Sequence, residues 1–119
     1  MYRIPKDLDL SAVVGQFTTQ VWVGQFDLQF TFGDADFAIE TPVNLFRAGE
    51  LVAHWEQGKW PDPEFYAIMN TQVTRCEVIG DRSIVFEFGN GIAMHLEDSP
   101  DQYESMQIRL KGRPSPWII

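Results

Sequence analysis

A short motif occurs twice in this 119-residue chain, each time at the end of a stretch of alternating residues. Phe30-Thr31-Phe32-Gly33 ends the first stretch, and Phe86-Glu87-Phe88-Gly89 ends the second, fifty-six positions later. The similarity extends upstream at the same spacing in three pairs of residues: Thr18 and Thr74, Val23 and Ile79, Leu28 and Ile84. The chain must therefore fold into a structure that accommodates two similar halves.

Both halves have the period of a β-strand. Apolar residues occupy every second position from Gln25 to Phe32, which predicts a half-buried strand. The side chains predicted to point inward are Phe26, Leu28, Phe30 and Phe32. Glycine-containing turns flank this strand, so residues 17–41 predict a meander of three strands. Residues 73–97 repeat the pattern, with Asn90-Gly91 as a strong hairpin signal.

The segment between the two meanders, residues 43–70, has a different character. For Val43–Lys59 the periodicity leaves two interpretations open, a helical turn or an irregular strand. Asp62-Pro63-Glu64 is typical of a helix start and predicts a short helix reaching Met69. The alternation from Ser105 to Leu110 predicts a further strand, and Trp117–Ile119 is predicted to dock as an apolar tail.

These patterns predict a mainly β protein with one short helix and a single domain over residues 1–119. A flat sheet covered by one short helix would leave many of the aromatic side chains exposed. Curling the sheet hides more of them and removes open edges. We therefore expect a small antiparallel β-barrel or a strongly curved sheet built from two pseudo-repeated three-strand meanders.

The formal net charge is −8, and the acidic residues gather in the two meanders. No Lys or Arg lies between Lys6 and Arg47, or between Arg82 and Arg109. Such a charge repels nucleic acid and attracts basic protein surfaces, although it also serves plain solubility. The alternation of the first strand predicts that Trp22 points away from the main core. It could lie in an interface with a partner or in a second core on the other face of the sheet. The candidate interaction residues are Trp22, Asp27, Asp34, Asp36, Glu40, Glu97 and Asp98.

No catalytic or metal-binding set is apparent, so we expect neither enzyme activity nor a cofactor. The only histidines are His54 and His95, and no motif places a Ser or Cys beside either. They are too far apart, without a second cysteine, for the usual zinc spacings. Tyr103 and Glu104 open the last predicted strand, and Glu104 has inward parity there. A buried carboxylate at that point would be a structural anchor or a site.

The chain contains no apolar stretch near the roughly eighteen residues that cross a bilayer, and its first residues lack a secretory apolar run. The single cysteine, Cys76, excludes an internal disulfide and is expected to be a small buried strand residue. These features favour a cytoplasmic protein without membrane contact.

Three features resemble a family of small bacterial proteins classed as a domain of unknown function. They are Val23-Gly24 before the first long strand, the repeated Phe-x-Phe-Gly hairpin, and Tyr103-Glu104-Ser105 at the last strand. The resemblance covers residues from about 10 to 110, although the family commonly has tryptophan where this chain has Met106. The size and acidic charge are also similar to those of bacterial toxin-immunity proteins.

The sequence thus favours an interaction protein, such as an immunity protein, that presents an acidic β surface to a basic partner. One alternative is a small barrel that binds or acts on an apolar ligand, lined by Phe26, Phe30, Phe32, Phe86 and Phe88. Another is a homodimer joined through edge strands.

Overall fold

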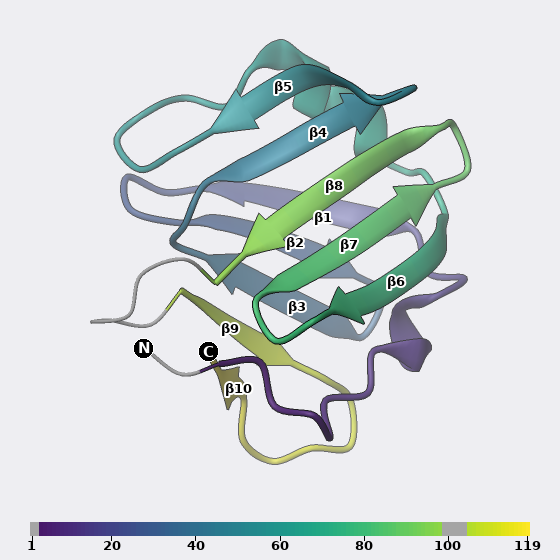
Figure 1. The fold of residues 1–119 in the computed structure, drawn as a ribbon, viewed down its shortest axis with the longest axis vertical. Coiled ribbons are helices and arrows are strands. Elements are labelled where there is room, and N and C mark those ends of the chain that lie inside the picture. Colours follow the sequence, from purple (N-terminus) through teal and green to yellow (C-terminus); the bar gives the residue numbers. More distant parts are fainter. Residues whose placement is uncertain (1–2, 99–104) are drawn as a thin grey trace.

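The computed structural model describes residues 3–98 and 105–119, whose strands form two antiparallel sheets (Figure 1). The first, called the β1 sheet, has the order β1-β2-β3-β9-β10. Its strands are β1 (Thr18–Val23), β2 (Leu28–Phe32), β3 (Ala35–Ile39), β9 (Met106–Arg109) and β10 (Trp117–Ile118). The second, called the β6 sheet, has the order β5-β4-β8-β7-β6. Its strands are β4 (Val43–Arg47), β5 (Glu50–Trp55), β6 (Val73–Ile79), β7 (Ser83–Phe88) and β8 (Ile92–Glu97).

The two sheets lie one behind the other, which confirms the prediction of a mainly β, antiparallel fold (Figure 1). In the described residues the strands are divided between two sheets with open edges, and they do not close into a barrel. Two short 3₁₀ helices complete the fold: η1 (Ser11–Val13) packs against β6, and η2 (Pro63–Ile68) packs against β5. No helix in the described ranges has the length and apolar character needed to cross a membrane.

The chain builds the two sheets by exchanging hairpins between them. β1, β2 and β3 lie in the β1 sheet, but the next hairpin, β4 and β5, joins the β6 sheet beside β8. β6, β7 and β8 then lie in the β6 sheet, and β9 and β10 join the β1 sheet beside β3. The strand orders remain the same when β1 to β5 are exchanged with β6 to β10. The repeat is therefore five strands long and has an approximate two-fold symmetry.

Each unit also begins in the same way, with a 3₁₀ helix followed by a residue of positive φ. That residue is Gly15 (φ 93°) in the first unit and Asn70 (φ 53°) in the second. The N–H of Gly15 donates to the carbonyl of Val73 at 2.8 Å, and the N–H of Asn70 donates to the carbonyl of Thr18 at 2.8 Å. Each unit thus binds the start of the other unit's first strand.

A β-bulge in the first strand of each unit fixes how the two units align. One extra residue lies in β1 between Thr18 and Gln20, and one lies in β6 between Val73 and Arg75. Both bulged residues are threonines whose hydroxyls donate to the opposite strand, Thr19 to a carbonyl at 3.2 Å and Thr74 to one at 3.1 Å. Thr19 is therefore the equivalent of Thr74. The alignments of Thr18 with Thr74 and of Val23 with Ile79 are each wrong by one residue, because they assumed equal spacing through the first turn; Val23 is the equivalent of Val78.

The segment 43–59, for which two interpretations were open, contains the β4–β5 hairpin. Its turn residues Ala48 and Gly49 both have positive φ, at 53° and 81°, as a tight hairpin turn requires. The register shifts between Leu45 and Phe46, so β5 carries a bulge. This extra residue breaks the alternation and made the strand hard to distinguish from a helical turn.

The other predicted elements near the two ends of the units are present. The short helix is η2, with Pro63 at its start and Phe65 and Ile68 buried. The last predicted strand is β9, and the C-terminal tail forms β10 with Ile119 fully buried. Ile119 exchanges backbone hydrogen bonds with Met106, so the tail pairs with β9 and is part of the sheet.

The core is built from the phenylalanines of the repeated motif. The rings of Phe32 and Phe86 stack across the two sheets, with centroids 5.0 Å apart and planes 25° apart. Phe37 packs edge-on against both rings, at 5.6 Å from Phe32 and 5.2 Å from Phe86. The inward prediction is wrong for Phe26, which is 61% exposed, because it lies in the turn before β2 begins at Leu28.

We predict that Phe32→Ala lowers the free energy of unfolding by about 3–5 kcal/mol, since it removes a fully buried ring from the contact between the sheets. The matched variant Phe26→Ala should change it by less than about 0.5 kcal/mol, because that ring is already in solvent. Urea unfolding followed by circular dichroism measures both. Equal losses for the two variants would contradict this description of the core.

Cys76 lies buried in β6, and burial raises the pKa of its thiol from 9.0 to about 12. We therefore predict that a chromogenic disulfide reagent labels the folded protein at pH 8 far more slowly than the protein unfolded in urea.

Between pH 9.0 and about 12 the unfolded thiol loses a proton that the folded thiol keeps, so the free energy of unfolding falls as pH rises. Cys76→Ala should lose less stability across that range. Rapid labelling of the folded protein would show that the thiol is accessible.

Candidate functional site

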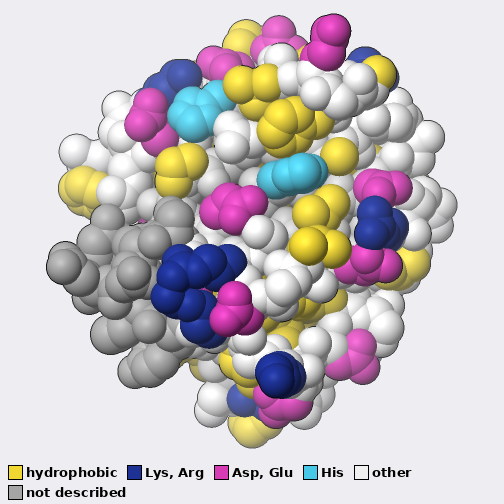
Figure 2. Space-filling model, viewed as in Figure 1, with side chains coloured by type: hydrophobic (Ala, Val, Ile, Leu, Met, Phe, Trp, Pro, Cys, Tyr) yellow, Lys and Arg dark blue, Asp and Glu magenta, His cyan; other side chains and the backbone are white. Residues whose placement is uncertain are grey.

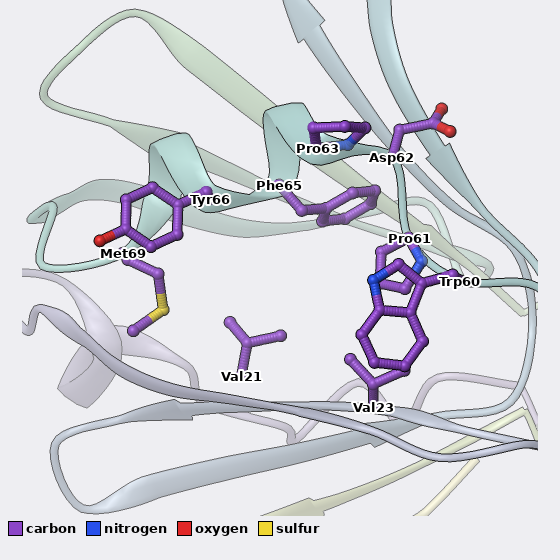
Figure 3. A pocket seen from close by; sticks show the side chains of 9 residues that line it. All are labelled: Val21, Val23, Trp60, Pro61, Asp62, Pro63, Phe65, Tyr66 and Met69. Atoms are coloured by element: carbon purple, nitrogen blue, oxygen red, sulfur yellow. The ribbon is translucent and has the colours of Figure 1, made fainter.

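A groove of about 380 Å³ lies between β1, an edge strand, and the segment that contains η2 (Figure 3). Val21 and Val23 of β1 form one side, and Phe65 of η2 lies on the opposite side. Trp60 lies over Val23 at one end, and Met69 lies at the other (Figure 3). The volume is within the usual range for ligand pockets, and the lining is mostly apolar.

Two large aromatic side chains of this groove are mostly in solvent: Trp60 is 77% exposed and Tyr66 is 81% exposed. The short helix explains Tyr66, because η2 turns its neighbours Phe65 and Ile68 into the core. Trp60 precedes Pro61, and proline disfavours a helical conformation in the residue before it. Exposed aromatic side chains gathered beside an apolar groove are typical of a binding surface.

The wall of the groove is held in place by polar contacts. Asp62 accepts a hydrogen bond from the backbone N–H of His54 at 2.9 Å and lies 3.6 Å from the Lys59 ammonium. The N–H of Gly58 donates to the carbonyl of Gln25 in the β1–β2 turn at 2.7 Å. A smaller hollow of about 250 Å³ shares Val23 and Trp60 with the groove and continues it past this contact. The wall is therefore preformed along the C-terminal half of β1.

The backbone of β1 leaves hydrogen-bonding groups along the groove. In an antiparallel pair of strands, residues that hydrogen-bond to the neighbouring strand alternate with residues whose backbone groups point away from it. The N–H of Gly24 donates to the carbonyl of Asp27 at the turn, so the N–H and C=O groups of Val21 and Val23 point away from β2. Only the start of this edge is covered, where Thr18 donates to Thr71 at 3.2 Å. No described hydrogen bond takes up the outward groups of the two valines. The groove thus combines an apolar lining with an open strand edge.

The repeat supplies an internal comparison for this groove. Cys76 and Val78 of β6 are the equivalents of the two groove valines of β1. The N-terminal segment runs beside β6 and contributes the buried side chains of Ile4 and Leu8. The N–H of Ile4 donates a hydrogen bond to the carbonyl of Asp81 at 2.8 Å. The segment before η1 therefore packs apolar side chains beside β6, whereas the equivalent segment before η2 leaves a groove beside β1.

The structure separates the predicted interaction residues. Trp22 is exposed on the outer face of the β1 sheet, with Asp36 nearby and Asp27 in the adjoining turn. Glu40 follows β3 in the same sheet, and Asp34 lies in the β2–β3 turn, 3.6 Å from Lys111. Glu97 belongs to β8 in the β6 sheet and accepts a hydrogen bond from Ser83 at 2.7 Å. These carboxylates therefore do not form one acidic face.

The prediction is wrong for Asp98, which is fully buried. Its carboxylate accepts a hydrogen bond from Ser105 at 2.6 Å and lies 3.7 Å from Arg3, and its backbone exchanges hydrogen bonds with Arg82. Asp98 lies two residues after the buried Leu96, so its side chain points to the same, inner face of the β6 sheet, and this spacing was the signal in the sequence that Asp98 is buried. Asp98 is thus a buried structural anchor of the kind considered for Glu104, while Tyr103 and Glu104 lie outside the described residues.

Both histidines contact neighbouring side chains, and His54 Nε2 lies 3.6 Å from the Glu56 carboxylate. His54 Nδ1 is 2.6 Å from the amide oxygen of Asn44, and the ring of His95 packs on Phe46 with centroids 4.6 Å apart. Within residues 3–98 and 105–119, no group of three or more His, Cys, Asp or Glu side chains could hold a metal ion.

Sequence reasoning missed the groove, although two signals pointed to it. Trp60 lies between Lys59 and Pro61 in a stretch without apolar periodicity, where a core residue is not expected. Tyr66 lies on the opposite side of the short helix from Phe65 and Ile68. Large aromatic side chains without a predicted core face are candidates for a binding surface.

No protein-family model matches the chain, and no curated protein or solved structure matches it.

Proposed function

We propose that this is a binding protein that takes an extended segment of a partner protein as an added strand beside β1. The observation that carries the proposal is the open edge of β1 beside an apolar groove. A strand added there would receive backbone hydrogen bonds from the two valines and place alternate side chains in the groove.

The charge around the groove favours a basic segment. Residues 56–69 carry Glu56, Asp62 and Glu64, with Lys59 as the only cation, and the whole chain has a net charge of −8. Electrostatic attraction of this kind speeds association and selects partners of opposite charge. An immunity protein that covers a basic toxin is the specific form of this proposal that the size and charge suggest.

The apolar-ligand alternative has less support. Phe30, Phe32 and Phe86 are fully buried, and their rings contact other phenylalanines, so they fill the core. Phe26 lies in solvent and lines no interior. A homodimer formed through two β1 edges is an outcome that the following experiment detects.

We predict that selection from a phage-displayed library of random dodecapeptides yields sequences that alternate apolar residues with Lys or Arg. A synthetic peptide of the enriched consensus should bind in calorimetry, with an affinity that falls as salt rises. Val23→Pro removes one outward N–H, and Trp60→Ala removes one end of the groove. Each should weaken binding by about tenfold or more, which is about 1.4 kcal/mol.

The matched control is Trp22→Ala, which deletes an exposed tryptophan of the same strand outside the groove. It should bind the peptide as the parent protein does, and thermal melting should show that all three variants fold. A library without an enriched pattern, or a consensus peptide indifferent to both groove variants, would refute the proposal. A dimer in sedimentation that Val23→Pro dissociates would replace the partner with a second copy.

A further inference from the structure

A second hollow, of about 370 Å³, lies on the outer face of the β1 sheet and is independent of the groove. Two rows of cross-strand neighbours on β1, β2, β3 and β9 line it. The first row is Trp22, Gln29, Ala38 and Gln107. The second row is Gln20, Thr31, Asp36 and Arg109. The small side chain of Ala38 lies between larger neighbours, which leaves space above the sheet.

The equivalent place on the β6 sheet is closed by its own side chains. Arg75 lies 2.5 Å from the Glu87 carboxylate and also pairs with Glu77, and the pair with Arg75 lowers the pKa of Glu77. His95, the equivalent of Ala38, packs its ring against Phe46. Figure 2 shows this face, with the histidines and apolar side chains across its upper and central part and acidic and basic side chains beside them. The hollow on the β1 sheet is thus a departure from the repeat.

The charges of the hollow balance within it. Asp36 and Arg109 are directly opposite each other on β3 and β9, so one negative and one positive charge lie on neighbouring strands of the hollow. Asp36 also accepts a hydrogen bond from the hydroxyl of Thr31 at 2.8 Å. Since this pair is neutral as a whole, the hollow does not select an anion or a cation. It suits a neutral ligand.

The hydrogen-bonding groups of the hollow are of both kinds. The amides of Gln20, Gln29 and Gln107 contain both donors and acceptors, Asp36 accepts, and Arg109 only donates. The Gln29 amide already donates one hydrogen bond to the Asp27 carboxylate, at 2.7 Å, and Gln107 is also engaged. Within the described residues, no hydrogen bond or ion pair engages the guanidinium of Arg109, so its donors are available. Neighbouring hydroxyl groups, each of which donates and accepts, match such a surface.

Trp22 adds an apolar plane to these polar groups. The side chain is 55% exposed, and its Nε1–H donates to the Gln20 amide oxygen at 3.2 Å. The indole edge is therefore held while much of the ring remains available to a ligand. A fixed aromatic ring offers contact area at little entropic cost and packs well on aliphatic C–H groups.

We propose that this hollow binds a neutral saccharide, with one sugar ring stacked on Trp22 and its hydroxyl groups bound by the surrounding amides, Asp36 and Arg109. A sugar ring has an aliphatic C–H face and a rim of hydroxyls, which is the combination that the hollow presents. This site rests on side chains of the outer sheet face and does not depend on the peptide groove.

The test is a nuclear magnetic resonance titration of the whole protein with cellohexaose, maltohexaose, laminarihexaose, mannohexaose and chitohexaose at millimolar concentration. We expect at least one of these neutral hexaoses to shift the Trp22 indole N–H signal, which Trp22→Phe identifies. Trp22→Ala and Gln29→Ala should each weaken that binding by about fivefold or more. Trp60→Ala, which affects the peptide groove, should leave it unchanged.

Three results would overturn the proposal. The first is that none of the five hexaoses moves the indole signal. The second is that the hexaose binds the Trp22→Ala variant as tightly as the parent protein, which would place it elsewhere. The third is that an anionic oligogalacturonate binds more tightly than every neutral hexaose, because the balanced charges of Asp36 and Arg109 would then not decide the ligand. The substituted side chains are exposed, so the variants should keep the parent melting temperature.

Discussion

The contact between Phe32 and Phe86 is the interaction on which the rest of the structure depends. Each phenylalanine belongs to one copy of the repeated motif, and their rings stack where the two sheets meet. Burial of large apolar rings is the main favourable term available to a domain of this size. Once this contact is made, the strands on both sides are fixed, and their edges lie at the margins of the sandwich.

The sequence was most informative where strands were regular. Period-two alternation identified β2 and β7, and the Asn-Gly turn identified the β7–β8 hairpin. It failed where one residue interrupted the period, as in the bulge at Thr19 and the bulge in β5. It also failed for Phe26, where the turn was counted as strand. In each case the error is a local change of register, which a period cannot report.

The candidate sites were less predictable, because they depend on which sheet a residue joins. A linear run of acidic residues gave no indication that Asp36 and Glu97 belong to different sheets. The equivalence of the β4–β5 and β9–β10 hairpins is absent from the sequence, since these strands share their topology and little of their side-chain pattern. Only the pairing of β4 with β8 and of β9 with β3 reveals it.

Strand β1 serves both candidate sites through the alternation of its side chains. Val21 and Val23 face the groove, while Gln20 and Trp22 face the hollow on the outer surface. At both places the equivalent position beside or on the β6 sheet is occupied by side chains of the chain itself. The symmetry of the backbone is thus combined with a strong asymmetry of the surfaces, and β1 borders both open ones.

The exchange of hairpins between the sheets also bears on how such a chain could arise. Two identical five-strand units that traded their last hairpins would form a domain-swapped dimer, and joining them end to end would give the strand order seen here. In that arrangement the symmetric pairing already holds the units together, so the connection from β5 to η2 is not needed to pair them. Its side chains are then free to serve another role. It is this connection that carries Trp60 and forms one wall of the groove.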